Sequence, residues 1–469
     1  MRDFFEFKVN QAELIIVLRT SIVIMDSNLG ISSRAQKFLK SGMPYLGKAL
    51  EAIFNQYSPE NPTGPIPLVI AENKLCSDML LEHFRGFHDY SADVLNYTDT
   101  TGMPVSKLAL ATFLSSNVFG GFPVSPQDLV LSSGCTGLLY GLSVLLFEIG
   151  DSVLIPAPYY AAFDPDFLSI GGVTTVPVWP VGEPSFTGTS SEASKWILNN
   201  LTEESLEEAY TRSLKANHTP KALLIVNPGN PTGVVYTDDQ LMIAVNFTRK
   251  HNMHLIVDEI YALSVYDSPI PFKSIVTLLE NELGSHVHVL WGLSKDFGAS
   301  GFRVGAMYSR NNHLLTAFSN LNLGFQVSNV VQQMMAHMLN DTIFVDKFLT
   351  KNRVELKRSY DIVHTHLSPL GITIISPAGA SIFCFADFRI LLTENTFQGE
   401  RELFNLMADK GVVLTPGESC HCQIPGFFRI CFAYVPVDSL LEAMKRIKEM
   451  ADILLISTPI DLTSLKIEI

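Results

Sequence analysis

A lysine directly after a buried apolar run has the clearest chemical potential in this 469-residue sequence. Lys295 follows the run Val287–Trp291, which predicts a strand, and precedes a glycine-containing stretch with Arg303. The carboxyl end of a strand in a parallel sheet is where α/β folds bind ligands. An uncharged amine there can form a Schiff base with a carbonyl group, and a nearby arginine can bind a phosphate. We therefore expect Lys295 to be a nucleophile and Arg303 a phosphate ligand, although an isolated Ser-Lys pair would more simply be an exposed loop.

Two further polar residues follow a second predicted strand. Asp258 comes directly after the apolar run His254–Val257, and Tyr261 lies three residues later. A carboxylate at this place can keep a pyridine nitrogen protonated, which makes the ring an electron sink. A tyrosine hydroxyl can hydrogen-bond a phenolic oxygen of the ring and lower the pKa of an imine. Either residue alone would suit a cap or a half-buried core position, but together with Lys295 they predict a site for a substituted pyridine.

The segment Asn227–Gly233 follows the predicted strand Ala222–Val226 and contains two Asn-Pro pairs and two glycines. Such residues mark a constrained loop. A rigid turn alone does not explain why both polar positions are amides. We therefore expect Asn230 to donate to the same ring oxygen as Tyr261.

Gly134, Cys135 and Thr136 open a helix that the sequence predicts over Thr136–Ile149. Backbone N–H groups at the start of a helix bind phosphate well, and a threonine hydroxyl adds one donor. The pattern is weak alone, because many strand-to-helix turns contain such residues. Combined with Arg303 it predicts a phosphate site.

Two other features complete the candidate site. Tyr159 and Tyr160 follow a further predicted strand, and one of them can stack on the face of the pyridine ring. Arg429 lies among apolar residues, and a buried arginine needs a partner. The carboxylate of a substrate and an internal acidic residue are both possible partners at this stage.

These residues belong to a region in which short apolar runs alternate with helical stretches. The runs are mostly continuous, as expected for strands buried on both faces, and intervening helices imply a largely parallel sheet. The predicted strands of this α/β region are Asp128–Ser133, Ser152–Ile155, Thr174–Val178, Ala222–Val226, His254–Val257, Val287–Trp291 and Val304–Tyr308. Gly182–Ala193 predicts a surface loop.

The whole chain predicts a large α/β domain and a smaller α+β domain. We expect an N-terminal extension over 1–30, the large domain over 95–335, and a small domain built from 31–94 and 336–455. Residues 456–469 are expected to be a tail. In the C-terminal part, strands are predicted at Ile372–Ile375, Ser381–Ala386, Val412–Leu414 and Phe427–Ala433.

Composition excludes several classes of function. The net charge of −14 argues against a nucleic-acid surface. The six cysteines form no C-x-x-C pair, which favours a cytoplasmic location, and Cys420-His421-Cys422 lacks a second ligand pair for a metal. Ala12–Met25 is apolar but is interrupted by Arg19 and too short to span a membrane, so we expect no membrane partner.

The order of the motifs N-P-G-N-P-T-G, D-E-I-Y, S-K-D-F-G and G-F-R-V-G resembles the class I/II aminotransferases, which are fold type I enzymes that use pyridoxal 5′-phosphate (PLP). Within that family the chain is most similar to 1-aminocyclopropane-1-carboxylate (ACC) synthases and their animal relatives. The similarity extends from about residue 31 to about residue 455. The supporting stretches are Ala71–Cys76, Pro158–Asp164, Ser294–Gly305 and Pro425–Ala433.

The resemblance implies a role for each candidate residue. Lys295 would bind PLP and transfer the α-proton of an amino acid, Tyr160 would stack on the ring, and Arg429 would bind the α-carboxylate. Glu72, in the A-E-N stretch, would contribute to substrate binding. Family members are typically homodimers with shared active sites, so that a tyrosine of the partner chain, for which Tyr97 is the candidate, would reach the phosphate.

Three positions depart from the pattern of plant ACC synthases. Thr100 stands where those enzymes have a tyrosine, Gly292 where they have a serine, and Lys74 where they have a glutamine. PLP binding is compatible with all three, whereas cleavage of S-adenosylmethionine is less well supported. The sequence thus leaves ring-forming elimination and transamination open. A catalytically silent relative that retains PLP as a structural or sensing ligand is the alternative.

Overall fold

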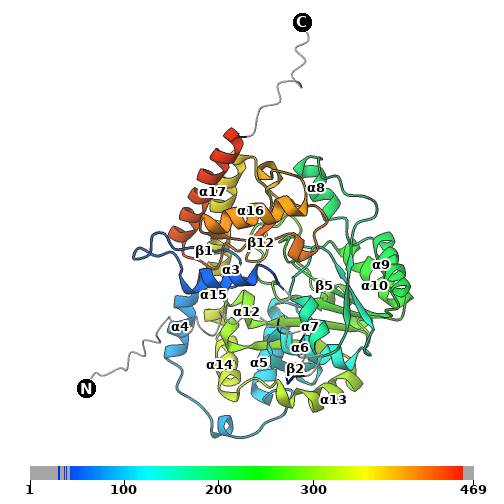
Figure 1. The fold of residues 1–469 in the computed structure, drawn as a ribbon. Helices are drawn as coiled ribbons and strands as arrows, with labels where there is room; N and C mark the ends of the chain where they lie inside the picture. Colours follow the sequence, from blue (N-terminus) through cyan, green and yellow to red (C-terminus); the bar gives the residue numbers. More distant parts are fainter. Residues whose placement is uncertain (1–29, 32–35, 37–38, 40–42, 458–469) are drawn as a thin grey trace, which may run out of the picture. The chain divides into compact units, whose positions relative to one another are not determined.

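Strands of the predicted α/β region form one large sheet in a computed structural model, which describes residues 30–31, 36, 39 and 43–457. The apolar segment Ala12–Met25 and nearly all of the expected extension and tail lie outside the described residues. Within 43–457 the sheet has seven strands in the order β2-β8-β7-β6-β5-β3-β4 (Figure 1). Their bounds are β2 Leu129–Ser133, β3 Ser152–Pro156, β4 Thr174–Val178, β5 Pro220–Val226, β6 His254–Asp258, β7 Val287–Gly292 and β8 Val304–Ser309.

Helices cover both faces of this sheet. Along β3, Val153 and Ile155 belong to one apolar core and Leu154 to the other, because successive side chains of a strand point to opposite faces. The first core also contains side chains of α6 (Gly134–Leu145) and α7 (Phe163–Ser169). The second contains side chains of α5 (Pro104–Asn117), α9 (Glu203–Lys215) and α10 (Asp238–Lys250). Burial on both faces explains why these strands are continuous apolar runs.

The largely parallel sheet that the sequence predicts is confirmed, with one strand reversed. β8 pairs antiparallel with both β2 and β7, whereas the pairs among β3, β4, β5, β6 and β7 are parallel. Only residues 293–303 connect β7 to β8, in the short helix α12 (Leu293–Asp296) and the 3-10 turn Ser300–Phe302. A parallel crossover needs a longer connection, so the chain returns in the opposite direction.

The smaller α+β region contains two sheets within the described residues. One has the order β12-β13-β10-β9, and in the other β1 pairs in parallel with β11. Through the pairing of Ile66 with Val412, a segment before the large sheet lies against the C-terminal part of the chain. The strands are β1 Ile66–Pro67, β9 Thr373–Ile374, β10 Cys384–Asp387, β11 Val412–Val413, β12 Thr415–Pro416 and β13 Phe427–Ile430.

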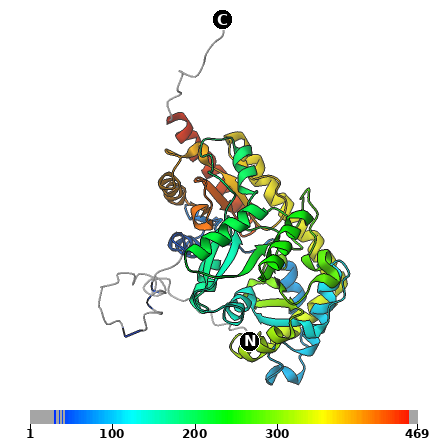
Figure 2. The same ribbon diagram turned by 90° about the vertical axis from the view of Figure 1, so that its right-hand side faces the viewer.

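The helices that surround these sheets lie near different ends of the large sheet. In both views of the ribbon, α16 and α17 lie at the opposite end of the chain's large sheet from α13 (Figures 1 and 2). None of the helices in the described residues is long and apolar enough to cross a membrane. Their bounds are α3 Leu46–Phe54, α4 Ser77–Arg85, α5 Pro104–Asn117, α6 Gly134–Leu145, α7 Phe163–Ser169, α8 Ser190–Ile197, α9 Glu203–Lys215, α10 Asp238–Lys250, α11 Ile275–Leu279, α13 Asn312–Leu321, α14 Asn329–Asn340, α15 Thr342–Leu367, α16 Phe397–Asp409 and α17 Val437–Ser457.

Several predicted boundaries were wrong by a few residues. The helix predicted over Thr136–Ile149 ends at Leu145. The loop predicted over Gly182–Ala193 is a loop only to Thr189, where a capping box with Glu192 starts α8. The small-domain strands are shorter than predicted because turns interrupt the apolar runs, as at Ser381, which has a positive φ of 72°. The domain boundaries themselves stay predictions.

Gly305 sets the distance between β8 and the start of α6. A Cβ atom at this position would lie 2.4 Å from the carbonyl carbon of Gly134, a contact with rigid main chain. We predict that Gly305→Ala lowers the free energy of unfolding by about 1–3 kcal/mol through overpacking. Urea unfolding followed by circular dichroism measures it. Gly301→Ala is the matched control, because nothing lies within 4 Å of its Cβ position, and equal stability of the two variants would contradict the prediction.

Candidate functional site

The carboxyl ends of three neighbouring strands bring most of the candidate residues to one cavity. Lys295 follows β7, Asp258 ends β6, and Asn230 lies in the loop after β5. Together with side chains from the starts of α6 and α7, they enclose about 180 Å³. The cavity is lined by Cys135, Thr136, Leu139, Tyr160, Phe163, Asp166, Val226, Asn230, Asp258, Ile260, Tyr261, Ser294, Lys295, Ser300 and Arg303.

Lys295 places its amine inside this cavity without an acidic partner. Its Nζ donates to the carbonyl oxygen of Ala71 at 2.5 Å, and no ion pair among the described residues includes it. Burial lowers the pKa of the Lys295 amine below its usual value. The site therefore favours the neutral amine, which is the nucleophilic form.

Asp258, Tyr261 and Asn230 line the cavity together, as the sequence predicts. Burial raises the pKa of Asp258 to about 7, against a hydrogen bond of 3.2 Å from the backbone N–H of Ile260. The Nδ2 of Asn230 donates to the hydroxyl of Tyr261 at 3.4 Å. A buried carboxylate of this kind is stabilised by a cation such as a protonated ring nitrogen, and the Asn–Tyr pair offers donors to a ring oxygen.

The predicted phosphate ligands Thr136 and Arg303 line the same cavity. Arg303 donates from Nη1 to the carbonyl oxygen of Ser300 at 3.0 Å and from Nη2 to that of Ser133 at 3.5 Å. A Cβ on Gly134, which has a φ of +75°, would lie 2.6 Å from Arg303 Nη2. Glycine at this position thus lets the guanidinium approach the first turn of α6, where the backbone of Cys135 and Thr136 can bind an anion.

The two adjacent tyrosines face different surroundings. Tyr160 lines the cavity and contacts Phe163 edge-on, with ring centroids 5.4 Å apart. Tyr159 instead donates from its hydroxyl to Asp164 at 2.8 Å. Tyr160 is therefore the one available to stack on a ring in the cavity.

Arg429 is buried in the small-domain sheet, with 2% of its surface exposed. It donates from Nη1 to Asn230 Oδ1 at 3.1 Å and from Nη2 to Val69 O at 2.9 Å and Thr415 Oγ1 at 3.1 Å. Its Nε has no hydrogen-bond partner, and its guanidinium forms no ion pair within residues 43–457. Of the two partners that the sequence leaves open, the internal acid is absent from the described part of the chain.

Glu72 and Tyr97 do not line the cavity. Glu72 accepts a hydrogen bond of 2.6 Å from Ser300 Oγ and contributes to the electrostatic environment of Lys295. Tyr97 is 95% exposed and reaches no site residue of its own chain.

Two acidic residues near the cavity were missed by the sequence-based reasoning. Asp166 on α7 lines the cavity, and burial raises the pKa of its carboxyl to about 7. Asp296 accepts hydrogen bonds from the backbone N–H of Leu263 at 3.2 Å, Ser264 Oγ at 2.7 Å and Trp291 Nε1 at 3.0 Å. It thereby connects the backbone of Lys295 with the segment that follows Tyr261. The position of Asp296 directly after Lys295 was the available signal.

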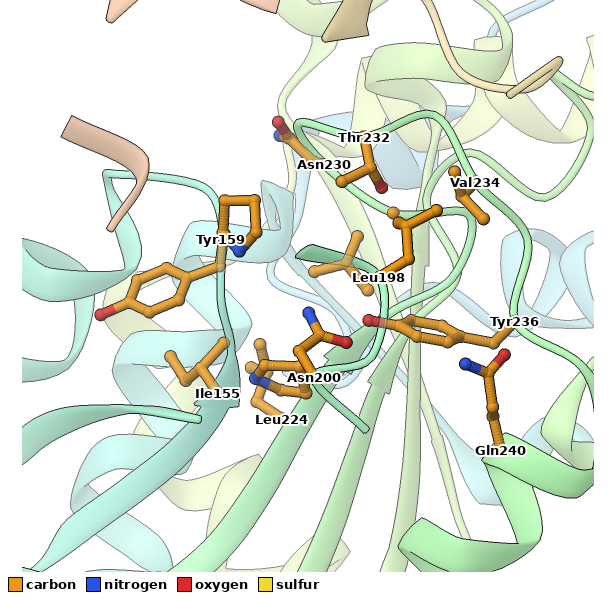
Figure 3. A pocket seen from close by; sticks show the side chains of 14 residues that line it. Ile155, Tyr159, Leu198, Asn200, Leu224, Asn230, Thr232, Val234, Tyr236 and Gln240 are labelled. Atoms are coloured by element: carbon orange, nitrogen blue, oxygen red, sulfur yellow. The ribbon is translucent and has the colours of Figure 1, made fainter. Parts of the chain in front are cut away.

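A smaller cavity of about 40 Å³ lies beside the main one, under the Asn-Pro loop. Val226 and Asn230 line both cavities. Figure 3 shows Asn200 and Tyr236 facing each other across the smaller one. The Nδ2 of Asn200 donates to Ala157 O at 2.8 Å, whereas its Oδ1 has no partner. This polar layer supports the loop from which Asn230 enters the main cavity.

The segment Cys420–Cys422 shows no metal site. The segment is not an extended chain, because Cys420 ends a 3-10 turn and His421 has a left-handed φ of 61°. The described residues contain no group of three or more His, Cys, Asp or Glu side chains that could hold a metal ion. All six cysteines, which lie within 43–457, are free.

Comparison with known proteins identifies similar chains. Residues 54–447 match the family model described as aminotransferase class I and II. The 1-aminocyclopropane-1-carboxylate synthase 11 of Arabidopsis thaliana is 34% identical over 406 residues, which cover 84% of this chain and 85% of that protein. A 1-aminocyclopropane-1-carboxylate synthase of Nicotiana tabacum is 33% identical over 411 residues, covering 84% and 80%.

Solved structures with a similar fold include aspartate aminotransferases. A mutant of the Thermus thermophilus enzyme has a TM-score of 0.71 and 20% identity, covering 90% of this chain and 99% of that one. The Thermotoga maritima enzyme has a TM-score of 0.68 and 23% identity, covering 90% and 100%. At this level of identity the similarity shows the fold.

The buried carboxyl of Asp296 generates a prediction about pH. Burial raises its pKa from 3.8 to about 7, so its contribution to stability is present at low pH and is lost as the pH rises through 7. Asp296→Asn stays neutral, and its amide can serve the same three partners. We predict that the free energy of unfolding of this variant, relative to wild type, rises by up to about 1.4 kcal/mol per pH unit between pH 4 and 7. Urea unfolding at several pH values measures the difference, and a difference independent of pH would exclude this account.

Proposed function

Because the chain belongs to the aminotransferase class I and II family, we propose that it transforms a small amino acid through abstraction of the α-proton by Lys295. Enzymes of this family use PLP, and PLP is the cofactor of this chain. The chain has the fold type I architecture of these enzymes. The observation that carries the proposed role is the buried Lys295 amine, which has no acidic partner and opens on a cavity.

The residues around the cavity fit PLP group by group. Asp258 would hold the ring nitrogen, and Tyr261 and Asn230 the ring oxygen. Tyr160 would cover one face of the ring. The phosphate would be bound by Arg303, by the hydroxyl of Thr136 and by backbone N–H groups at Gly134, Cys135 and Thr136.

The chain's own residues would divide the reaction between them. Bound PLP supplies an electron sink for the α-carbon of the substrate. Lys295 accepts the α-proton on its amine, whose pKa is lowered by burial. Arg429 binds the α-carboxylate through its unpartnered Nε side, and Glu72 stands beside Ser300 at the edge of the site.

Elimination and transamination are the two reactions to separate. The relatives described above are named ACC synthases, and the two solved structures described above are aspartate aminotransferases. Thr100 is one of the three positions that depart from the plant ACC synthases. Its hydroxyl donates to Ser319 O at 2.6 Å, and the residue does not line the cavity. Because this position differs from the tyrosine of plant ACC synthases, we favour transamination.

We further propose a cytoplasmic homodimer with shared active sites. Tyr97 and Leu95 are 95% and 87% exposed, although both are large and apolar. Two large side chains exposed so close together in the sequence fit a surface that contacts another chain. In a dimer, Tyr97 would contribute its hydroxyl to the phosphate site of the other chain. Analytical ultracentrifugation gives the mass that tests this proposal.

The role of Lys295 generates a prediction about bound PLP. We predict that purified protein shows a visible absorbance band from covalently bound PLP, and that Lys295→Ala abolishes both the band and turnover. Lys215→Ala, which changes an exposed lysine, is the control and keeps both. A wild-type protein without the band after incubation with PLP would refute the role of Lys295.

An activity screen separates the possible reactions. We predict that one or more amino acids, paired with a 2-oxo acid, give a new amino acid and a new oxo acid, detected by mass spectrometry. Incubation with S-adenosylmethionine tests for ACC and methylthioadenosine as products. Formation of those two products would replace transamination by elimination, and spectral change without any turnover would indicate the silent alternative.

A further inference from the structure

A second set of polar contacts joins the loop of Tyr160 to the segment that precedes Arg429. The Nε2 of His421 lies 2.7 Å from Asp164 Oδ2, and the His421 ring stacks on that of Tyr159 with centroids 4.5 Å apart. Tyr159 and Thr175 donate to the other oxygen of Asp164 at 2.8 and 2.6 Å. Figure 3 shows the Tyr159 ring pointing away from Asn200 and Tyr236. Asp164 thus serves three donors from three separate segments.

Two hydrogen bonds to main-chain carbonyl groups make the same connection. The backbone N–H of Tyr159 donates to Cys420 O at 2.8 Å, and Trp179 Nε1 donates to His421 O at 2.9 Å. Burial raises the pKa of Asp164, but the bonds from His421, Thr175 and Tyr159 outweigh it and lower that pKa below its usual value. The carboxylate is therefore held in its charged form, opposite the imidazole.

The segment fixed by His421 leads directly to Arg429. Cys420 ends the 3-10 turn that follows β12. Thr415 of β12 pairs with Arg429 of β13 and accepts a hydrogen bond from Arg429 Nη2. On the other side, Tyr159 is the neighbour of Tyr160, which lines the main cavity. The contact between Asp164 and His421 thus spans the two walls that would receive ring and carboxylate.

We propose that the Asp164–His421 contact is a positioning device for carboxylate binding, which holds Arg429 at a fixed separation from the Tyr160 loop. Asp164 and His421 are positioning residues, since neither lines the main cavity. The inference rests on the proposed function of Arg429 as the carboxylate ligand. It assigns to the Cys420–Cys422 segment a role that its sequence alone does not show.

The experiment uses variants of His421 in the protein with PLP bound. His421→Asn suits the left-handed backbone but is too short to reach Asp164, so it removes the contact without backbone strain. His421→Gln restores a donor of suitable length. Thr175→Val is the matched control, because it removes a different hydrogen bond to Asp164 from within the large sheet. Arg429→Lys is the positive control for loss of carboxylate binding.

Two measurements separate an effect on the position of Arg429 from a general effect on the stability of the protein. Calorimetric titration with maleate, an unreactive dicarboxylate, reports binding without turnover, and the KM and kcat of the amino-acid substrate report the reaction. We expect His421→Asn to raise the Kd of maleate and the KM by about 5- to 30-fold, with kcat and the PLP absorbance nearly unchanged. His421→Gln should recover most of the loss, and Thr175→Val should stay within about twofold of wild type.

The proposal is overturned if His421→Asn binds maleate as wild type does, or if Thr175→Val is as damaging as His421→Asn. It is also overturned if Arg429→Lys leaves maleate binding unchanged. A loss of kcat at constant KM would assign His421 to chemistry instead of positioning. Failure of the proposed function is distinguishable, because it removes the PLP absorbance of the wild type while the ranking of maleate affinities can still be measured.

Discussion

Burial of the Lys295 amine without an acidic partner is the constraint on which the rest of the site depends. A charged ammonium in such a place is costly, so the equilibrium moves toward the neutral amine. That form is reactive only if its backbone is held firmly. Asn73 Nδ2 donates to Lys295 O at 3.3 Å and to Asn352 Oδ1 at 2.8 Å, and Asn352 donates to Asp296 O at 3.3 Å. These amides hold the lysine backbone on both sides while its side chain remains free to react.

The same reasoning applies to the other buried charges. Burial raises the pKa of Asp258, Arg429 has an unpartnered Nε, and neither group forms an ion pair among the described residues. A protonated ring nitrogen would stabilise Asp258, and a substrate carboxylate would satisfy Arg429. Ligands that bind the native state alone also stabilise it. The polar groups of the site therefore favour binding of cofactor and substrate at the expense of the stability of the free protein.

The sequence predicted the strand ends well because those positions follow from local pattern. Lys295, Asp258 and Asn230 each come after a continuous apolar run, and parallel strands carry such residues to one edge. The reversal of β8 and the orientation of Asp166 were not predictable in this way. The direction of β8 depends on the length of a connection, and the face that α7 presents to the cavity depends on how it packs against α6. Likewise, the different surroundings of Tyr159 and Tyr160 depend on a tertiary contact, the hydrogen bond from the Tyr159 hydroxyl to Asp164.

Arg429 shows most clearly why the geometry of the substrate site cannot be predicted from the local sequence. Its guanidinium donates to Val69, Thr415 and Asn230, which come from three distant parts of the chain. Because these contacts occupy Nη1 and Nη2, the orientation of the guanidinium plane is fixed before any ligand binds. The free Nε then defines the edge from which a carboxylate must approach. A shift of β12 relative to the loop of Asn230 would turn this edge, so the separation between the two sheets is itself a determinant of substrate binding.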